Sequence, residues 1–141
     1  MNELHRQSCF VRFKTDSEKR ITCVFFATPE QVELLTQYGS VIIQDNTFNT
    51  NAYKYQLCLV VVVDKENRTQ IACQALVLRE RTEDFVFIFE CVAEMGKKHP
   101  KVIFTDADKA ATAAIAQVFP KSLHKYCIFH TIQNIRTHMG G

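Results

Sequence analysis

Two short apolar runs, each followed closely by an aspartate, constrain the fold of this 141-residue chain most strongly. Residues 41–43 lead to Asp45, and residues 102–104 lead to Asp106, 61 positions (106 − 45) further on. Short apolar runs rich in β-branched residues are typical of strands buried on both faces of a sheet. A carboxylate at the end of such a strand sits on a rigid element, where an unpaired charge costs several kcal/mol. Each aspartate therefore needs a partner or a function.

A local role is the alternative for both aspartates. Asp45 is followed by Asn46 and Thr47, and such residues favour turns because their side chains bond to nearby backbone. Asp106 precedes a predicted helix and could cap it, as Asp108 also could. The recurrence of a strand followed by an aspartate favours a functional role over two unrelated caps.

The first half of the chain predicts a β-hairpin, a short helix and a three-stranded meander. Thr28, Pro29 and Gln31 form a capping-box start for the helix, and Gly39 ends it. Polar, turn-rich segments separate the β-type runs, and consecutive strands of this kind pair most simply in antiparallel order. The expected strands are residues 9–13, 21–26, 41–45, 55–63 and 69–78.

The second half alternates helices and strands. Phe85, Ile88, Phe89, Val92 and Ala93 have helical spacing, so we expect them to form a packing face rather than a ligand site. A crossover helix predicts that the next strand lies parallel to a neighbour. The remaining expected elements are the end of this helix at residues 96–100, a strand at 101–106, a helix at 109–118, a strand at 122–126 and the start of a helix at 127–138.

This element order, β-β-β-α-β-α-β after a hairpin and a short helix, is that of the ribonuclease-H-like fold, an α/β arrangement on a mixed sheet. With the fourth strand of that series beside the first, Asp45 and Asp106 would end on adjacent strands. Two such carboxylates can share a pair of divalent ions about 4 Å apart, an arrangement used in phosphodiester chemistry. Mg²⁺ suits them because it prefers oxygen ligands, and without metal the two carboxylates would repel each other.

Composition limits the class of protein without identifying a partner. Hydrophobic residues at 47% and charged residues at 23% are ordinary globular values, and a net charge of +2 gives no argument for a nucleic-acid partner. The six cysteines form no C-x-x-C pair, and the first residues contain no apolar signal core, so free thiols in a reducing compartment are expected. No apolar run approaches the ~20 residues of a membrane span, and we expect a soluble, intracellular protein.

Three motifs in order resemble those of Mutator-like element (MULE) transposases. Residues 45–51 (DNTFNTN) resemble the D-x-T-[YF]-x-T-N segment around the family's first acid. Residues 105–110 (TDADKA), followed by Ala114, Ile115 and residues 118–120 (VFP), resemble its T-D-x-D-x-A…A-I…V-F-P segment. Residues 127–130 (CIFH), followed by Asn134, are similar to its C-x-x-H…N motif. The resemblance covers roughly residues 20–138, and Asn46 departs from the Gly or small residue that the family often has.

The resemblance implies a DDE-type transposase catalytic domain that cleaves and joins transposon-end DNA with two Mg²⁺ or Mn²⁺ ions. Asp45 and Asp106 match the first two catalytic, metal-binding acids. The third acid, a glutamate, lies in the family beyond a helical insertion after the C-x-x-H motif, so this chain alone is expected to be inactive. Domesticated relatives of the far-red-impaired-response type carry the same domain as transcription factors, which is the alternative function.

The same resemblance sets expectations for organisation and setting. Residues 1–27 would form a hairpin leading into the domain, and residues 28–141 a partial transposase domain that ends where the insertion begins. The partner would be the terminal inverted repeats of an element, with a possible homodimer in the full-length protein, no membrane, and a nuclear location.

Cys127 and His130 could form half of a zinc site, with only His124 and His138 as nearby further ligands. We favour a structural role for the pair, in which Cys127 packs and His130 anchors a helix near the acids, and zinc is not expected. Glu90 and Glu94 come too early for a third acid. Basic residues that could touch phosphates, or equally form a solvated surface, are Lys54, Lys97, Lys98, Lys101, Lys109, Lys121 and Lys125.

Overall fold

A computed structural model describes residues 8–47 and 55–126, which form one seven-stranded mixed sheet and three helices. The strands are β1 (Phe10–Thr15), β2 (Ile21–Ala27), β3 (Val41–Thr47), β4 (Gln56–Val63), β5 (Thr69–Val77), β6 (Val102–Thr105) and β7 (Leu123–Tyr126). The helices are α2 (Pro29–Tyr38), α3 (Thr82–Gly96) and α4 (Lys109–Val118). The predicted order of elements is confirmed over these residues. The expected helix start at 127–138 lies outside them.

The sheet has the strand order β1-β2-β5-β4-β3-β6-β7. β3, β4 and β5 pair as the predicted antiparallel meander, and β6 lies parallel to β3, as the crossover through α3 required. β7 extends the parallel part beyond β6. β3, β5, β6 and β7 therefore all run in one direction. We call the end of the sheet where they finish the carboxyl end, and the other the amino end.

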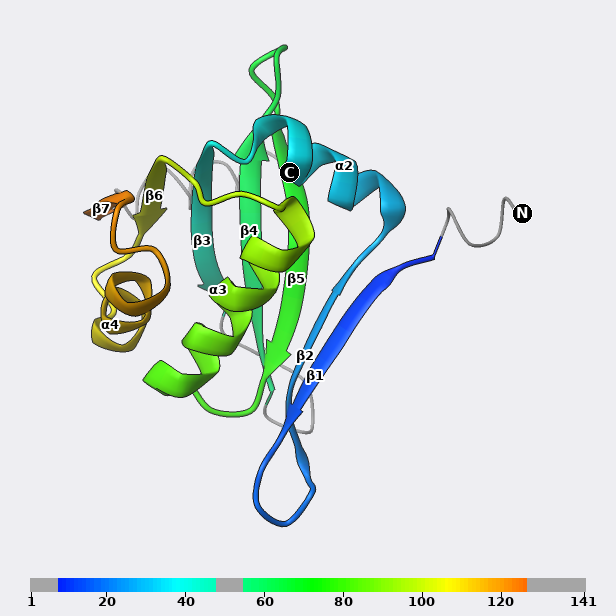
Figure 1. The fold of residues 1–141 in the computed structure, drawn as a ribbon, viewed down its shortest axis with the longest axis vertical. Helices are drawn as coiled ribbons and strands as arrows, with labels where there is room; N and C mark the ends of the chain where they lie inside the picture. The colour runs from blue at the N-terminus through cyan, green and yellow to red at the C-terminus, as the bar shows by residue number, and fades with distance from the viewer. Residues whose placement is uncertain (1–7, 48–54, 127–141) are drawn as a thin grey trace.

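The hairpin of β1 and β2 joins this same sheet because β2 pairs with β5. Since β2 runs against β5, the β1–β2 turn lies at the carboxyl end (Figure 1). The boundary expected between residues 27 and 28 stays a prediction. Directly after it, Thr28 caps α2: its hydroxyl accepts from Gln31 N–H, and the Gln31 side chain accepts from Thr28 N–H.

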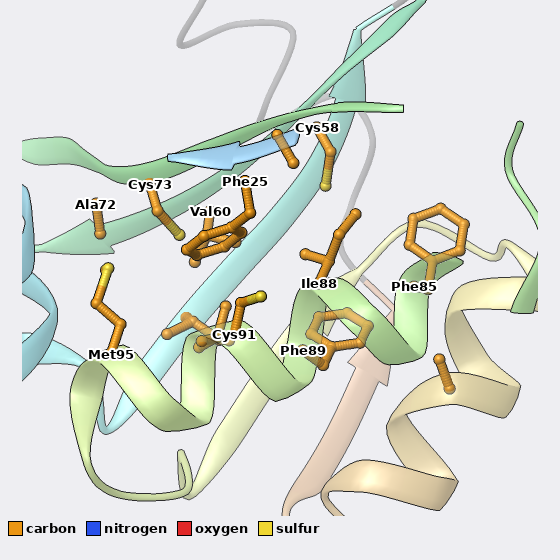
Figure 2. Packing of buried hydrophobic residues seen from close by; sticks show 14 of the residues in the cluster. Phe25, Cys58, Val60, Ala72, Cys73, Phe85, Ile88, Phe89, Cys91 and Met95 are labelled. Atoms are coloured by element: carbon orange, nitrogen blue, oxygen red, sulfur yellow. The ribbon is translucent and has the colours of Figure 1, made fainter. Parts of the chain in front are cut away.

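The core lies between α3 and the sheet. Phe85, Ile88 and Phe89 of α3 are fully buried, and Figure 2 shows α3 turning its apolar side chains toward the strands. The Phe89 ring also meets the Phe119 ring edge to face, with centroids 5.9 Å apart, where α3 packs against α4. The prediction that these phenylalanines form a packing face is confirmed.

The expectation that residues 41–43 are buried on both faces of the sheet is wrong. Ile42 is fully buried, whereas Val41 is 41% exposed and Ile43 is half-buried. Alternate side chains of a strand point to opposite faces, and α3 lies across one face of β3, β4 and β5 (Figure 1). At residues 41–43, β3 is therefore fully covered only on the face that Ile42 shares with α3.

The cysteines of the described residues are free thiols, with Cys9 exposed and Cys23, Cys58, Cys73 and Cys91 buried. Burial raises the pKa of the Cys23, Cys58 and Cys91 thiols to about 12, which keeps them protonated and unreactive. Cys127 lies outside these residues. Within the described ranges, no helix has the length and apolar character that crossing a membrane requires.

Candidate functional site

Asp45 lies inside β3 rather than at its end. The strand continues through Asn46 and Thr47, which pair with Cys58 and Leu57 of β4. Asp45 itself is opposite Leu59 and is only 5% exposed. The alternative that Asp45 caps a turn at Asn46 is therefore wrong, because β4 supplies the backbone partners that a turn would otherwise have to provide.

Asp106 follows the last residue of β6 and matches Asp45 in register. Ile43 of β3 lies beside Phe104 of β6, and each aspartate is two positions further along its own strand. The same parallel register therefore brings Asp45 and Asp106 to equivalent places at the carboxyl end of the sheet. The expectation that the two acids occupy adjacent strands is confirmed for their backbone positions.

The cap of α4 is Asp108, not Asp106. The Asp108 carboxylate accepts a hydrogen bond from the Ala111 N–H at 2.8 Å, as an N-cap residue does. Asp106 contributes only its backbone carbonyl, which accepts from the Asp108 N–H at 2.8 Å. The capping alternative for Asp106 is therefore wrong.

A third carboxylate, Glu80, approaches this end of the sheet and was not singled out from the sequence. Its Oε2 accepts from Asn46 Nδ2 at 3.4 Å. Burial, and then the charges of Asp108 and Asp106, raise the pKa of Glu80. Burial, and then the charge of Asp108, raise the pKa of Asp106. Negative charge therefore gathers around Glu80 and Asp106 and opposes the ionisation of both.

Glu80 reaches the acids because β5 runs in the same direction as β3, so the segment after β5 returns to the carboxyl end. Residue type and spacing carry no signal for this, since Glu80 lies in a polar link between a strand and a helix. The only available signal was topological: in the predicted meander, the first and third strands end on the same side.

Asn46 links Glu80 to the interior of the sheet. Gln44, which is 1% exposed, donates from Nε2 to Asn46 Oδ1 at 2.8 Å and also lies 3.2 Å from Cys58 Sγ. The Asn46 amide group then donates to Glu80. Asn46, the residue that departs from the family pattern, thus joins the strand of Asp45 to the neighbouring carboxylate.

The donor types at the carboxyl end fit a divalent ion such as Mg²⁺, which takes carboxylate oxygens. Their spacing does not complete such a site: among residues 8–47 and 55–126, no set of three His, Cys, Asp or Glu side chains is gathered closely enough to hold a metal. Metal binding by Asp45 and Asp106 therefore stays a prediction.

The predicted C-x-x-H pair, Cys127 and His130, lies outside the described residues, as does His138. His124, the other candidate zinc ligand, lies on β7, and its Nε2 is 2.7 Å from Thr105 Oγ1. The Thr105 hydroxyl donates to the Asp106 carbonyl at 2.8 Å, so the His124 ring nitrogen is the donor to Thr105. Burial lowers the pKa of His124, which favours the neutral ring over the charged one.

Several of the basic residues that could touch phosphates, or equally form a solvated surface, lie far from the acids. Lys97 and Lys98 follow α3, and the Lys98 ammonium group donates to the Thr36 carbonyl. Lys101 and Lys121 precede β6 and β7, so all four lie toward the amino end of the sheet. Lys109 and Lys125 are nearer the carboxyl end, and Lys54 lies outside the described residues.

Comparison with known proteins places the chain in a family. The family model of the MULE transposase domain matches residues 41–134, about two thirds of the chain. Among similar proteins, FAR1-RELATED SEQUENCE 5 of Arabidopsis thaliana is 26% identical over 125 residues, covering 88% of this chain and 16% of that protein. FAR-RED IMPAIRED RESPONSE 1 of the same plant is 26% identical over 127 residues, covering 89% of this chain and 15% of that protein.

A third similar protein carries an unrelated name. The PKS-NRPS hybrid synthetase cheA of Chaetomium globosum is 32% identical over 108 residues, covering 74% of this chain but 2% of that protein. So small a share gives no argument for synthetase chemistry here. The chain spans about one sixth of the length of the two Arabidopsis proteins. On the family match across both aspartate strands, the chain belongs to the MULE transposase domain family.

Proposed function

We propose that this chain forms part of a DDE-type transposase catalytic domain of ribonuclease-H-like fold, in which Asp45 and Asp106 are the first two acids. The observation that carries the proposal is their equivalent position on two adjacent parallel strands. The order β5-β4-β3-β6-β7 supports the fold, because it places the fourth strand of the β-β-β-α-β-α-β series beside the first. The substrate would be transposon-end DNA in the nucleus.

The proposed site depends on how rigidly each acid is held. Asp45 is fixed within β3, which lies between β4 and β6, so its backbone cannot move without breaking the sheet. Asp106 leaves β6 at a tight link to α4 that Asp108 caps. Mg²⁺ or Mn²⁺, when bound, would offset the repulsion between the carboxylates and polarise a phosphodiester. Carboxylates held in this way keep their oxygen atoms in place for an ion and the phosphate of a DNA strand.

The test is strand cleavage by the full-length protein that carries this domain. Asp45→Asn and Asp106→Asn should each abolish Mn²⁺-dependent cleavage of transposon-end DNA while the circular dichroism spectrum stays unchanged. Glu90→Gln, which alters an exposed carboxylate of α3, is the matched control and should cleave normally. Normal cleavage by either aspartate variant would overturn the assignment.

A second candidate is a domesticated, non-catalytic module that binds DNA for transcriptional regulation. The similarity to FAR-RED IMPAIRED RESPONSE 1 favours it. In this case the full-length protein would bind DNA and cleave none with Mg²⁺ or Mn²⁺. Asp45→Asn would then leave every measured function unchanged.

A further inference from the structure

A hollow of about 520 Å³ opens at the carboxyl end of the sheet. Its walls come from the β1–β2 turn, the residue before β4, and the segment that leaves β5. Lys19 and Arg20 of the turn and Arg79 from the β5 exit line it, and Tyr55 and Asp16 complete the polar lining. These elements are far apart in sequence, and the sheet alone brings them together.

The hollow carries surplus positive charge. Its lining has three cations and one carboxylate, and that carboxylate is already engaged. Asp16 accepts from the backbone N–H groups of Glu18 and Arg20, each at 2.9 Å, and pairs with Arg20 Nε at 3.0 Å. Lys19 and Arg79 are exposed and form no ion pair with any residue that the structure describes. Two cations are therefore available to a ligand.

The position of Arg79 ties the hollow to the proposed catalytic acids. Arg79 directly precedes Glu80, which contacts Asn46, the neighbour of Asp45. β5 is two places from β3 in the sheet, and strands lie about 4.8 Å apart, so the strand that leads to Arg79 is roughly 10 Å from the strand of Asp45. In duplex DNA this corresponds to about three nucleotides of one strand, at 3.4 Å each.

We propose that Lys19 and Arg79 form a phosphate-binding subsite for the DNA strand that flanks the cleavage position. The inference rests on the proposed function, since it takes DNA as the ligand of the carboxyl end. The arginine offers a planar fork of donors to a phosphate, and the lysine offers a compact charge from the opposite wall. The subsite positions DNA and reads no bases, so its contribution is independent of sequence.

The test compares two double variants of the 141-residue chain by fluorescence anisotropy with labelled duplex DNA over a salt series. Lys19→Asn/Arg79→Gln removes both cations; Lys19 has φ 65°, which asparagine adopts readily, so the turn is preserved. Lys65→Gln/Lys121→Gln is the matched control, because these two exposed lysines lie toward the amino end. Thermal unfolding confirms that each variant is folded.

The subsite variant should flatten the slope of log affinity against log salt by about 2, on DNA of any sequence, while the control keeps the slope of the unaltered chain. Equal slopes for the unaltered chain and the subsite variant would overturn the subsite and leave the proposed function standing. If the unaltered chain binds no DNA, the subsite fails together with the DNA-binding part of the proposed function. The cleavage test on Asp45 and Asp106 is independent of both results.

Discussion

Asp64 and Asp106 lie at opposite ends of the sheet, and their surroundings shift their pKa values in opposite directions. Asp64 opens the β4–β5 turn at the amino end and is 8% exposed. It accepts hydrogen bonds from Gln70 Nε2 at 3.0 Å and from the Glu66 and Arg68 N–H groups at 2.9 and 3.0 Å. The Gln70 bond, followed by the Arg68 N–H bond, lowers the pKa of Asp64 to about 2.

At the carboxyl end the carboxylates have each other as neighbours. Burial and a nearby charge raise the pKa of Asp106, and burial and two nearby charges raise that of Glu80. The two sites differ in what surrounds the carboxylate: hydrogen-bond donors dominate around Asp64, whereas burial and a neighbouring negative charge dominate around Asp106. Perturbation of this second kind is common at active sites.

The largest expected effect is on stability at Asp64. Asp64→Ala leaves the turn N–H groups of Glu66 and Arg68 without their acceptor, so the melting temperature should fall by several degrees or more. Differential scanning calorimetry measures this. Asp64→Asn keeps one acceptor oxygen and should fall in between. If Asp64→Ala has the same melting temperature as the unaltered chain, Asp64 does not stabilise the turn and the comparison fails.

The contribution of Asp64 to stability should also depend on pH. Because the folded-state pKa of Asp64 is lowered, its stabilisation is fully present above the unfolded value of about 3.9 and is lost as the pH falls toward about 2. Urea unfolding at a series of pH values should therefore show a loss of stability between about pH 4 and pH 2. Asp64→Asn should be less stable above this window and should show a shallower decline within it.

The smallest effect is expected at the carboxyl end. Raised folded-state pKa values mean that stability is lost as the pH rises through the unfolded and then the folded pKa, so at neutral pH these charges oppose folding. Asp106→Asn and Glu80→Gln should each change the free energy of unfolding by less than about 1 kcal/mol, in the stabilising direction. Urea unfolding at neutral pH measures both, with Glu90→Gln as control. A clear loss of stability in either variant would make its carboxylate structural, like Asp64.

The element order followed from the sequence because each signal was local. The Thr28–Gln31 capping box, the helical spacing of Phe85 and Phe89, and the strand type of residues 102–104 all hold in the structure. The register of Asp45 and Asp106 followed from two strand–aspartate runs and a crossover helix. These features depend on neighbours within a few residues and on a single topological rule.

Other features depend on pairing between distant segments and had no local signal. Asn46 favours turns by type, yet β4 pairs with it and extends β3 by two residues. Glu80 lies at the carboxyl end of the sheet because β5 runs in the same direction as β3. The cationic hollow joins Lys19 to Arg79 across the sheet. In each case the tertiary contact decides the outcome, and the amino-acid type does not.

The most direct test of the central claim is Mn²⁺ titration of the 141-residue chain, followed by backbone amide NMR. A paramagnetic ion broadens the signals of nearby amides. If the carboxyl end is the metal site, broadening should begin at Asp45, Asn46 and Asp106, spare residues 64–68, and vanish in Asp45→Asn/Asp106→Asn. Broadening that starts around Asp64, or that survives in the double variant, would contradict the claim.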